Sequence, residues 1–268
     1  MTRITDTASI ARAAELAPVR DAIRTAKLRL LRMHFESGVG HIGGNLSCLD
    51  FLVCFYRQRR PDDLFVLSKG HSAGALYIAL WSIGALSDED LATFHRDNTR
   101  LPGHPPAQGI PEIPFATGSL GHGLPLAAGI ALGRQLQQQP GRTFCLVSDG
   151  ELNEGSIWEA LIFIAHRQLP ITIVIDANGL QGFGSTREVA DLGALGGKIG
   201  AFVPVREIDG HDAGAWMALL SEPVAGPRAI VAHTRKGAGV SFMEGRMEWH
   251  YLPMNEAQYR QACEEVSR

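Results

Sequence analysis

The chain has 268 residues, enough to bury a full hydrophobic core, and its 45% hydrophobic and 20% charged residues are typical of one globular domain. A net charge of −3 gives no electrostatic reason to expect binding to nucleic acid or to an anionic membrane, and no uncharged apolar run reaches membrane-spanning length. The charged N-terminus is unlike a secretory signal, and the four cysteines lack CxxC spacing, so we expect a cytoplasmic protein with reduced thiols.

Apolar runs that alternate with amphipathic stretches predict an α/β fold: a parallel sheet with helices on both faces. Residues 1–18 are expected to form an N-terminal arm or short helix, and residues 19–268 a single domain. Pro18 suits the first position of the first amphipathic helix, Asn45 can cap the second, and Ser87-Asp-Glu-Asp90 has the pattern of a capping box. The expected helices span about 18–36, 46–57, 71–84, a short stretch after Ser87, 122–137, 157–165 and 212–220. The expected strands span 64–67, 143–148, 171–176, 202–208 and 228–234.

Two long loops interrupt this alternation. Residues 97–117 contain five prolines, and a loop of that length in a compact domain is usually functional. Residues 179–200 form a glycine-rich loop after the third strand. Glycine clusters near strand ends allow the backbone to approach a ligand closely, so we expect these loops to line one ligand crevice.

A carboxylate and an amide follow two successive strands. Asp149 directly follows the strand 143–148, and Asn178 follows the strand 171–176, with one helix between the two strands. In a right-handed strand–helix–strand unit these two ends lie side by side. The two side-chain oxygens and a nearby backbone carbonyl would suit Mg²⁺ or Ca²⁺ and leave room for a phosphate. The alternative is that Asp-Gly and Asn-Gly are ordinary turns.

Four histidines stand beside glycine in loop or strand-end positions: His41, His71, His104 and His122. Histidine at a ligand crevice can donate to phosphate oxygens or move protons near neutral pH. His71 follows a strand and opens a helix, where the helix dipole favours an anion, although a polar cap is the alternative. The stretch Gly118–Gly123 also precedes a helix, so its backbone amides are candidates for contacts to a phosphate or a cofactor ring.

Six segments, in the same order, resemble the N-terminal, diphosphate-binding half of transketolases, which use thiamine diphosphate. They cover roughly residues 20–255 of the chain. The segments are Gly40-His-Ile-Gly-Gly-Asn45, Leu67-Ser-Lys-Gly-His71, Pro102-Gly-His-Pro105, Thr117-Gly-Ser-Leu-Gly-His-Gly123, Ser148-Asp-Gly-Glu-Leu-Asn-Glu-Gly155 and Asp176-Ala-Asn178.

The resemblance implies a role for each matching residue. The implied Mg²⁺ ligands are Asp149, Asn178 and the carbonyl of Leu180, with Ca²⁺ as a substitute. The implied cofactor contacts are His71, Gly118, Ser119, Leu120, Gly150, Glu154, Asn178 and His250. The implied catalytic histidines, which face the reacting carbon and the sugar hydroxyls, are His41, His104 and His250. Glu154 and Glu159 resemble acidic residues at the family's subunit interface, although Glu159 also fits an ordinary helix surface.

Two departures refine this resemblance. Ser148 stands where the metal motif usually has glycine, and the Gly-His-Ile-Gly-Gly and Glu248-Trp-His-Tyr segments look like those of bacterial two-chain transketolases. No segment of the chain matches the family's second domain, which holds the aminopyrimidine ring and most substrate-phosphate contacts. We therefore expect half of an enzyme, completed by a C-terminal transketolase subunit in an α2β2 assembly. The implied reaction moves a two-carbon ketol unit from a ketose, expected to be phosphorylated, to an aldose.

Two alternatives stay open at this point. The α subunit of a two-chain 2-oxo acid dehydrogenase also anchors thiamine diphosphate and has the Asp-Gly…Asn site, but the Leu-Ser-Lys-Gly-His and Pro-Gly-His-Pro segments favour a sugar substrate. The second alternative is a non-catalytic subunit that binds the cofactor and regulates a partner. The full set of histidines argues against it, because a scaffold does not need them.

Overall fold

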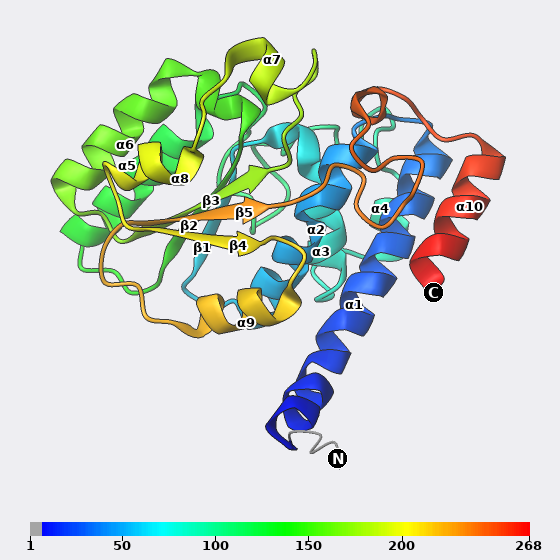
Figure 1. Ribbon diagram of the computed structural model, residues 1–268, viewed down its shortest axis with the longest axis horizontal. Coiled ribbons are helices and arrows are strands. Elements are labelled where there is room, and N and C mark those ends of the chain that lie inside the picture. Colours follow the sequence, from blue (N-terminus) through cyan, green and yellow to red (C-terminus); the bar gives the residue numbers. More distant parts are fainter. Residues whose placement is uncertain (1–6) are drawn as a thin grey trace, which may run out of the picture.

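The structure is a computed structural model that describes residues 7–268, with side chains described from residue 16 onward. Within these residues the chain forms a five-stranded sheet of order β1-β2-β3-β5-β4, and every neighbouring pair is parallel. The carboxyl ends of the strands therefore lie along one edge (Figure 1). The strands are β1 (Leu64–Leu67), β2 (Thr143–Ser148), β3 (Ile171–Ala177), β4 (Val205–Asp209) and β5 (Arg228–His233). The predicted α/β fold is confirmed.

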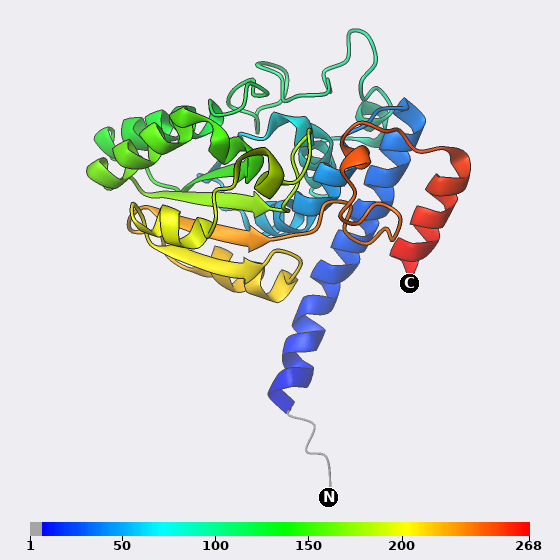
Figure 2. The ribbon, with the colours of Figure 1, turned by 45° about the horizontal axis from the view of Figure 1, so that its top comes forward.

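Helices cover both faces of the sheet. The longer ones are α1 (Thr7–Ser37), α2 (Ile42–Gln58), α3 (Ala73–Trp81), α5 (Gly123–Leu136), α6 (Gly155–Arg167), α9 (Ala213–Ser221) and α10 (Glu256–Ser267). Phe144 and Leu146 of β2 face a core that they share with α1, α2, α3 and α9, whereas Cys145 and Val147 face a second core beneath α5 and α6. Figure 2 shows α5 and α6 on one side of the sheet and α9 on the other. Burial on both faces explains why the strands have continuous apolar sequences.

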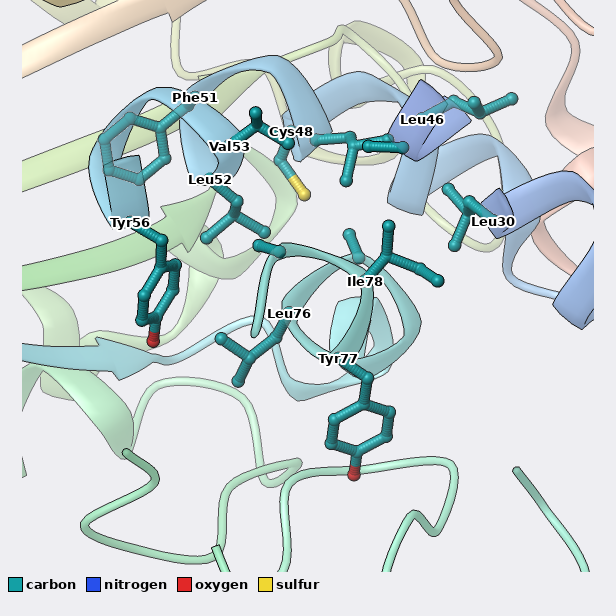
Figure 3. Close-up of a cluster of buried hydrophobic side chains, with 14 of the residues drawn as sticks. Leu30, Leu46, Cys48, Phe51, Leu52, Val53, Tyr56, Leu76, Tyr77 and Ile78 are labelled. Carbon is teal, nitrogen blue, oxygen red and sulfur yellow. The ribbon is translucent and has the colours of Figure 1, made fainter. Parts of the chain in front are cut away.

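Helices α2 and α3 pack against each other and hold the proline-rich loop in place. Leu52 of α2 and Leu76 and Ile78 of α3 belong to the same buried cluster (Figure 3). The hydroxyl of Tyr77 points out of this cluster and donates to the carbonyls of Pro102 at 2.9 Å and His104 at 3.2 Å. Tyr77 therefore holds the loop 97–117 against the core at His104, which the resemblance implied to be catalytic.

Several predicted boundaries are wrong. Helix α1 begins at Thr7, so Pro18 lies inside it, whereas residues 1–6 of the expected arm lie outside the described residues. Proline is usually a helix start because inside a helix it removes one backbone donor and its ring clashes with the preceding turn, but here the helix continues on both sides of it. The expected loop 179–200 contains two short helices, α7 (Thr186–Ala190) and α8 (Leu195–Gly200).

The remaining short elements complete the chain. They are η1 (Gly70–Ser72), α4 (Asp88–Leu91), η2 (Gly150–Asn153) and η3 (Met247–His250). The capping box predicted at Ser87 is present, since Ser87 accepts from the N–H of Asp90 and Asp90 accepts from the N–H of Ser87. Helix α10 packs beside α1, where Phe35 and Tyr259 stack with ring centroids 4.4 Å apart. Neither η3 nor α10 was predicted from the sequence.

One titratable side chain is buried in the core without a charged partner. His34 of α1 is 1% exposed, its ring lies 5.5 Å from that of Phe94, and its Nε2 has no hydrogen-bond partner. Its Nδ1 lies 3.5 Å from the carbonyl of Val39. Burial is the main cause that lowers the pKa of His34 to about 4. The native protein therefore holds this ring neutral, while the unfolded chain binds a proton more readily.

We predict that His34 makes the protein acid-sensitive. Because the native pKa lies below the unfolded value of 6.5, its contribution is complete above pH 6.5 and is lost as the pH falls towards 4. The loss amounts to about 3 kcal/mol. Urea unfolding at several pH values should show a smaller acid-induced loss in His34→Leu than in the unmodified protein. His166→Leu, at an exposed position of α6, is the control, and equal slopes in all three proteins would contradict the prediction.

Candidate active site

Four strand ends meet at one cavity of about 250 Å³. The segments after β1, β2, β3 and β5 each contribute lining residues, as expected for a ligand site at the carboxyl edge of a parallel sheet. The lining residues are Gly44, His71, Gly118, Leu120, Ser148, Gly150, Asn178, Leu180, Gln181, Gly182, Phe183, Lys236, His250 and Tyr251.

Asp149 connects two of these segments. Ser148 pairs with Asp176 in the sheet, so the ends of β2 and β3 lie side by side, as predicted. The Asp149 carboxylate accepts from the N–H of Gly150 at 2.8 Å and from the N–H of Gly179 at 2.6 Å. Burial, followed by the charge of Asp176, raises the pKa of Asp149 to about 6. A positive ligand beside this carboxylate would therefore be stabilising.

The two other oxygen donors that the sequence indicated lie in the loop after β3. The Oδ1 atom of Asn178 accepts from the N–H of Leu180 at 3.0 Å, and its Nδ2 donates to Asp176 at 3.3 Å. Residues 7–268 contain no cluster of three or more His, Cys, Asp or Glu side chains suited to a metal ion. A cation here would therefore depend on the Asp149 carboxylate and on neutral oxygens from Asn178 and Leu180, a hard set of donors.

Behind the cavity, a buried ion pair organises the strand ends. Lys69 and Asp176 form a salt bridge with both side chains almost completely buried. Asp176 also accepts from the hydroxyls of Ser47, at 2.6 Å, and Thr234. Burial opposes the charged form of each group, but Asp176 raises the pKa of Lys69 to about 12 and Lys69 lowers the pKa of Asp176. Both groups are charged at neutral pH.

The four histidines that the resemblance implied, His41, His71, His104 and His250, converge from distant segments, whereas His122 is exposed and does not line the cavity. The His41 ring centroid lies 5.9 Å from that of His71, 6.3 Å from His104 and 5.1 Å from His250. His41 precedes α2 with a positive φ of 66°, an uncommon conformation for a residue with a side chain. The His41 N–H donates to the carbonyl of His250 at 3.0 Å. The His41 carbonyl accepts from the side-chain amide of Asn45 at 2.7 Å. Asn45 therefore lies inside α2 and holds His41, instead of capping the helix as predicted.

These histidines are neutral at physiological pH. Burial is the largest cause that lowers the pKa of His41, His71 and His104, and neighbouring positive groups or histidines add to it. Burial and then Lys236 lower the pKa of His250 to about 3. A neutral imidazole can donate from one nitrogen and accept at the other.

Lys236 determines which nitrogen of His250 can donate. The Lys236 ammonium lies 2.9 Å from Nδ1 of His250 and 3.3 Å from the carbonyl of Gln181. An ammonium group can only donate, so Nδ1 of His250 accepts and its Nε2 carries the ring proton. Burial and then Lys69 lower the pKa of Lys236 to about 8, which leaves it mostly protonated at pH 7.

Lys236 is also the best indication of the ligand's charge. It is 2% exposed and lines the cavity, but no carboxylate of the described residues forms a salt bridge with it. A buried charge is costly unless it is paired. The cavity therefore presents an uncompensated cation to an anionic ligand.

The loop Gly118–Gly123 lies against the histidines. A side chain at Gly118 would come within 2.8 Å of the His104 ring, and Gly118 has a φ of 144°, so the position needs glycine. Gly118 and Leu120 line the cavity, whereas Ser119 is exposed.

Most of the residues that the sequence indicated lie together, but not all. Those that line the cavity are His71, Gly118, Leu120, Gly150, Asn178, Leu180 and His250. Asp149 lies directly behind the cavity, and His41 and His104 lie next to its histidines. Glu154 and Glu159, however, are exposed at the start of α6 and do not line it.

Three functional candidates were missed in the sequence: Lys69, Asp176 and Lys236. Lys69 and Asp176 lie within recognised segments, but only the fold shows that they pair. Lys236 had a local signal, because it directly precedes Gly237 just after a strand, in a position equivalent to the other strand-end loops.

The fold and the site define an α/β protein with a cavity at the carboxyl edge of its parallel sheet, lined by a buried lysine. Residues 40–265 match the family described as "Transketolase, thiamine diphosphate binding domain". The chain therefore belongs to the transketolase family, and the resemblance seen in its sequence motifs is confirmed.

Relatives of similar length are single subunits of transketolases. The chain is 36% identical to one subunit of the apulose-4-phosphate transketolase from Actinobacillus succinogenes, over 94% of this chain and 96% of the relative. It is also 36% identical to the 6-deoxy-6-sulfo-D-fructose transketolase subunit SqwG from a Clostridium species, over 86% of this chain and 90% of the relative.

Longer transketolases contain a region that is similar to this chain. The crystal structure of transketolase from Campylobacter jejuni is similar with a TM-score of 0.84 and 25% identity, over 93% of this chain. The chain spans only 42% of the length of that enzyme. In the part of the chain that the structure describes, no helix combines the length and the apolarity needed to cross a membrane.

We predict that Lys236 keeps His250 neutral. In Lys236→Met the pKa of His250 should rise above about 3, because a positive neighbour is removed, but remain below the ordinary 6.5, because burial is the larger cause. Histidine-labelled NMR titration would measure this, with the His250 signal identified by its loss in His250→Gln. Lys198→Met, at an exposed position of α8, is the control, and an unchanged titration of His250 in Lys236→Met would refute the assignment.

Proposed function

We propose that this chain is the N-terminal subunit of a two-chain transketolase. It anchors the diphosphate of thiamine diphosphate through Mg²⁺, and together with a C-terminal subunit it transfers a two-carbon ketol unit from a ketose to an aldose. The observation that carries the proposal is the unpaired Lys236 ammonium, buried in a cavity that Asp149 and Asn178 border. A diphosphate and its metal ion would satisfy both the cation and the carboxylate.

Mg²⁺ fits the donors that the chain offers, with Ca²⁺ as a substitute. Each carboxylate oxygen of Asp149 accepts one N–H and retains a further lone pair. The Asn178 amide oxygen and the Leu180 carbonyl oxygen complete a set of three protein oxygens. Mg²⁺ usually binds one or two carboxylates together with substrate phosphates, which suits this small number of ligands.

The remaining predicted contacts follow from this placement. His71 and Gly150 line the cavity near Asn178 and would contact the diphosphate. Gly118, Ser119 and Leu120 would contact the cofactor through their backbone, with Ser119 exposed on the outer side of the loop. Glu154 would reach the cofactor or a neighbouring subunit only after assembly, since it is exposed in the single chain.

Bound thiamine diphosphate supplies a carbon nucleophile and an electron sink for cleaving a bond next to a carbonyl. The chain's own residues position the substrate and hold its protons. Nε2–H of His250 would donate to the substrate oxygen on which negative charge develops. His41 and His104, as neutral rings, can accept a proton from a hydroxyl and return it. Tyr77 fixes the backbone at His104 and so keeps that ring beside His41.

A second chain is proposed because the cavity has an exposed apolar rim. Phe183 is 86% exposed, Tyr251 54% and Leu252 47%, which is unusual for large apolar side chains that surround a site. Ile162 and Phe163 are also exposed on the outer side of α6, next to Glu159. These surfaces suit contacts with a second copy of this chain and with a C-terminal subunit in an α2β2 assembly, with Glu154 and Glu159 at the interface.

The substrate is proposed from the relatives, whose names specify apulose-4-phosphate and 6-deoxy-6-sulfo-D-fructose. Both are sugars that carry an anionic group, so we propose a phosphorylated or similarly charged ketose as the donor. The proposed compartment is the cytoplasm, which fits four free thiols.

We predict that Asp149→Ala abolishes binding of thiamine diphosphate in the presence of Mg²⁺, because it removes the only carboxylate of the proposed metal site. Calorimetry with the chain and its complementary subunit would measure the affinity. Asp209→Ala is the matched control, since Asp209 also ends a strand of the same sheet but lies at the edge strand β4. Unchanged affinity in Asp149→Ala would refute the metal site.

We also predict that the chain alone lacks ketol transfer and that mixing with the complementary C-terminal subunit restores it. The assay follows two-carbon transfer from a ketose phosphate to an aldose, with no lipoyl acceptor added. Activity that instead required a 2-oxo acid and a lipoyl acceptor would indicate a dehydrogenase subunit. Cofactor binding without any activity in the mixture would indicate a non-catalytic subunit.

A further inference from the structure

Gly121 lies buried in the loop Gly118–Gly123. Its backbone N–H and its backbone carbonyl are both hydrogen-bonded to side chains. Its N–H donates to Oε1 of Glu151 at 2.8 Å, and its carbonyl accepts from the Ser156 hydroxyl at 2.8 Å. Gly121 adopts a φ of 82°, and an added side chain would come within 2.5 Å of the Ser156 hydroxyl oxygen. The backbone of this loop is therefore enclosed between two side chains that come from elsewhere in the sequence.

Both side chains belong to the segment that follows Asp149. Glu151 lies in η2 and Ser156 in the first turn of α6. The proposed metal ligand and the two groups that hold Gly121 thus occupy eight consecutive positions, 149–156. A displacement of Gly121 relative to Glu151 and Ser156 breaks both hydrogen bonds.

Glu151 also connects to the end of strand β1. It is completely buried, and besides Gly121 it accepts from the Ser68 hydroxyl at 2.5 Å and the N–H of Ser148 at 3.4 Å. Ser68 follows β1 directly, and its own backbone N–H donates to Leu146 of β2. One carboxylate therefore connects the segments after β1 and after β2 with the loop that precedes α5.

We propose that Glu151 and Ser156 are positioning residues that hold the two cofactor-binding loops in one fixed arrangement. The inference rests on the proposed function, in which Asp149 binds the metal and Gly118–Leu120 contact the cofactor. Neither Glu151 nor Ser156 lines the cavity, so both act through Gly121. A loop that is already ordered binds its ligand more tightly, because less conformational freedom is lost on binding.

The hydrogen bonds allow a graded set of variants. Glu151→Ala removes the acceptor and leaves the buried N–H of Gly121 and the Ser68 hydroxyl unpaired. Oε1 of Glu151 makes the two short bonds, to Ser68 and Gly121, and Glu151→Gln can keep an oxygen at this position. The amide nitrogen of the glutamine then replaces Oε2, which makes only the longer contact to Ser148. Ser156→Ala removes the bond to the Gly121 carbonyl without removing a buried carboxylate.

The matched control is Glu265→Ala. Glu265 also accepts from a serine hydroxyl and a backbone N–H, those of Ser241, at 2.7 and 2.6 Å, but it lies in α10 on the surface. It therefore loses the same kinds of hydrogen bond as Glu151→Ala at a place remote from the cavity.

The first experiment uses the cofactor-free chain and does not depend on the proposed function. Hydrogen–deuterium exchange of peptides that cover 118–123 should be roughly tenfold to hundredfold faster in Glu151→Ala, and faster to a smaller extent in Ser156→Ala. Glu151→Gln should stay close to the unmodified protein. Circular dichroism identifies any variant that fails to fold, in which case Ser156→Ala decides. Exchange in folded Ser156→Ala and Glu151→Ala that equals that of Glu265→Ala would overturn the proposal.

The second experiment measures the affinity for thiamine diphosphate and Mg²⁺ with the complementary subunit present. The affinity should fall roughly tenfold in Glu151→Ala and be restored in Glu151→Gln. If exchange increases but the affinity does not change, the positioning role is wrong, while loss of binding in Asp149→Ala still supports the cofactor site. If Asp149→Ala also binds normally, the proposed function itself fails.

Discussion

The Asp176 carboxylate is the group on which the geometry of the site depends. It accepts hydrogen bonds from four side chains: Ser47, Lys69, Asn178 and Thr234. These donors come from α2 and from the segments that follow β1, β3 and β5, so one buried acceptor fixes the relative positions of four elements. A buried ion pair contributes little net stability, because desolvation offsets its attraction. What the pair with Lys69 provides here is a defined geometry, in which Asp176 orients the Asn178 amide. Burial and then the charge of Asp176 raise the pKa of Asp149, whereas Lys69 lowers it.

The two buried lysines, Lys69 and Lys236, differ in whether a carboxylate neutralises them. Lys69 is neutralised by Asp176 and serves the structure, whereas Lys236 has no such partner and faces the cavity. The charge of Lys236 disfavours protonation of His250, and the histidines near it remain neutral as well. Burial therefore keeps these rings neutral, and the charge of Lys236 adds to that effect at His41, His71 and His250. A ligand that satisfies Lys236 also stabilises the fold, because it binds only the native state.

The sequence allowed the sheet and the carboxylate–amide pair to be predicted, because those signals are local. Apolar runs mark β2 and β3, and the residues that directly follow them are Asp149 and Asn178. The Lys69–Asp176 pair could not be predicted in this way, since 107 positions separate its members and only the strand order brings them together. Helix α1 was predicted too short, because Pro18 was taken as a helix start, whereas the helix begins at Thr7 and continues through Pro18. Asn45 looked like a helix cap, but its side chain bonds His41 and Ala75 from within α2.

The site combines buried groups with an exposed rim, and this contrast has a thermodynamic consequence. The groups that would hold a diphosphate are buried and mutually bonded, whereas the rim of the cavity at Phe183 and Tyr251 is exposed and apolar. If a second chain covers this rim, the cofactor lies between a rigid anion site and a surface that is completed only on assembly. Binding of the cofactor and binding of the partner must then strengthen each other by the same factor, because the coupling between two sites is reciprocal. Under that arrangement, a substitution that weakens cofactor binding to this chain would also weaken the assembly of the two chains.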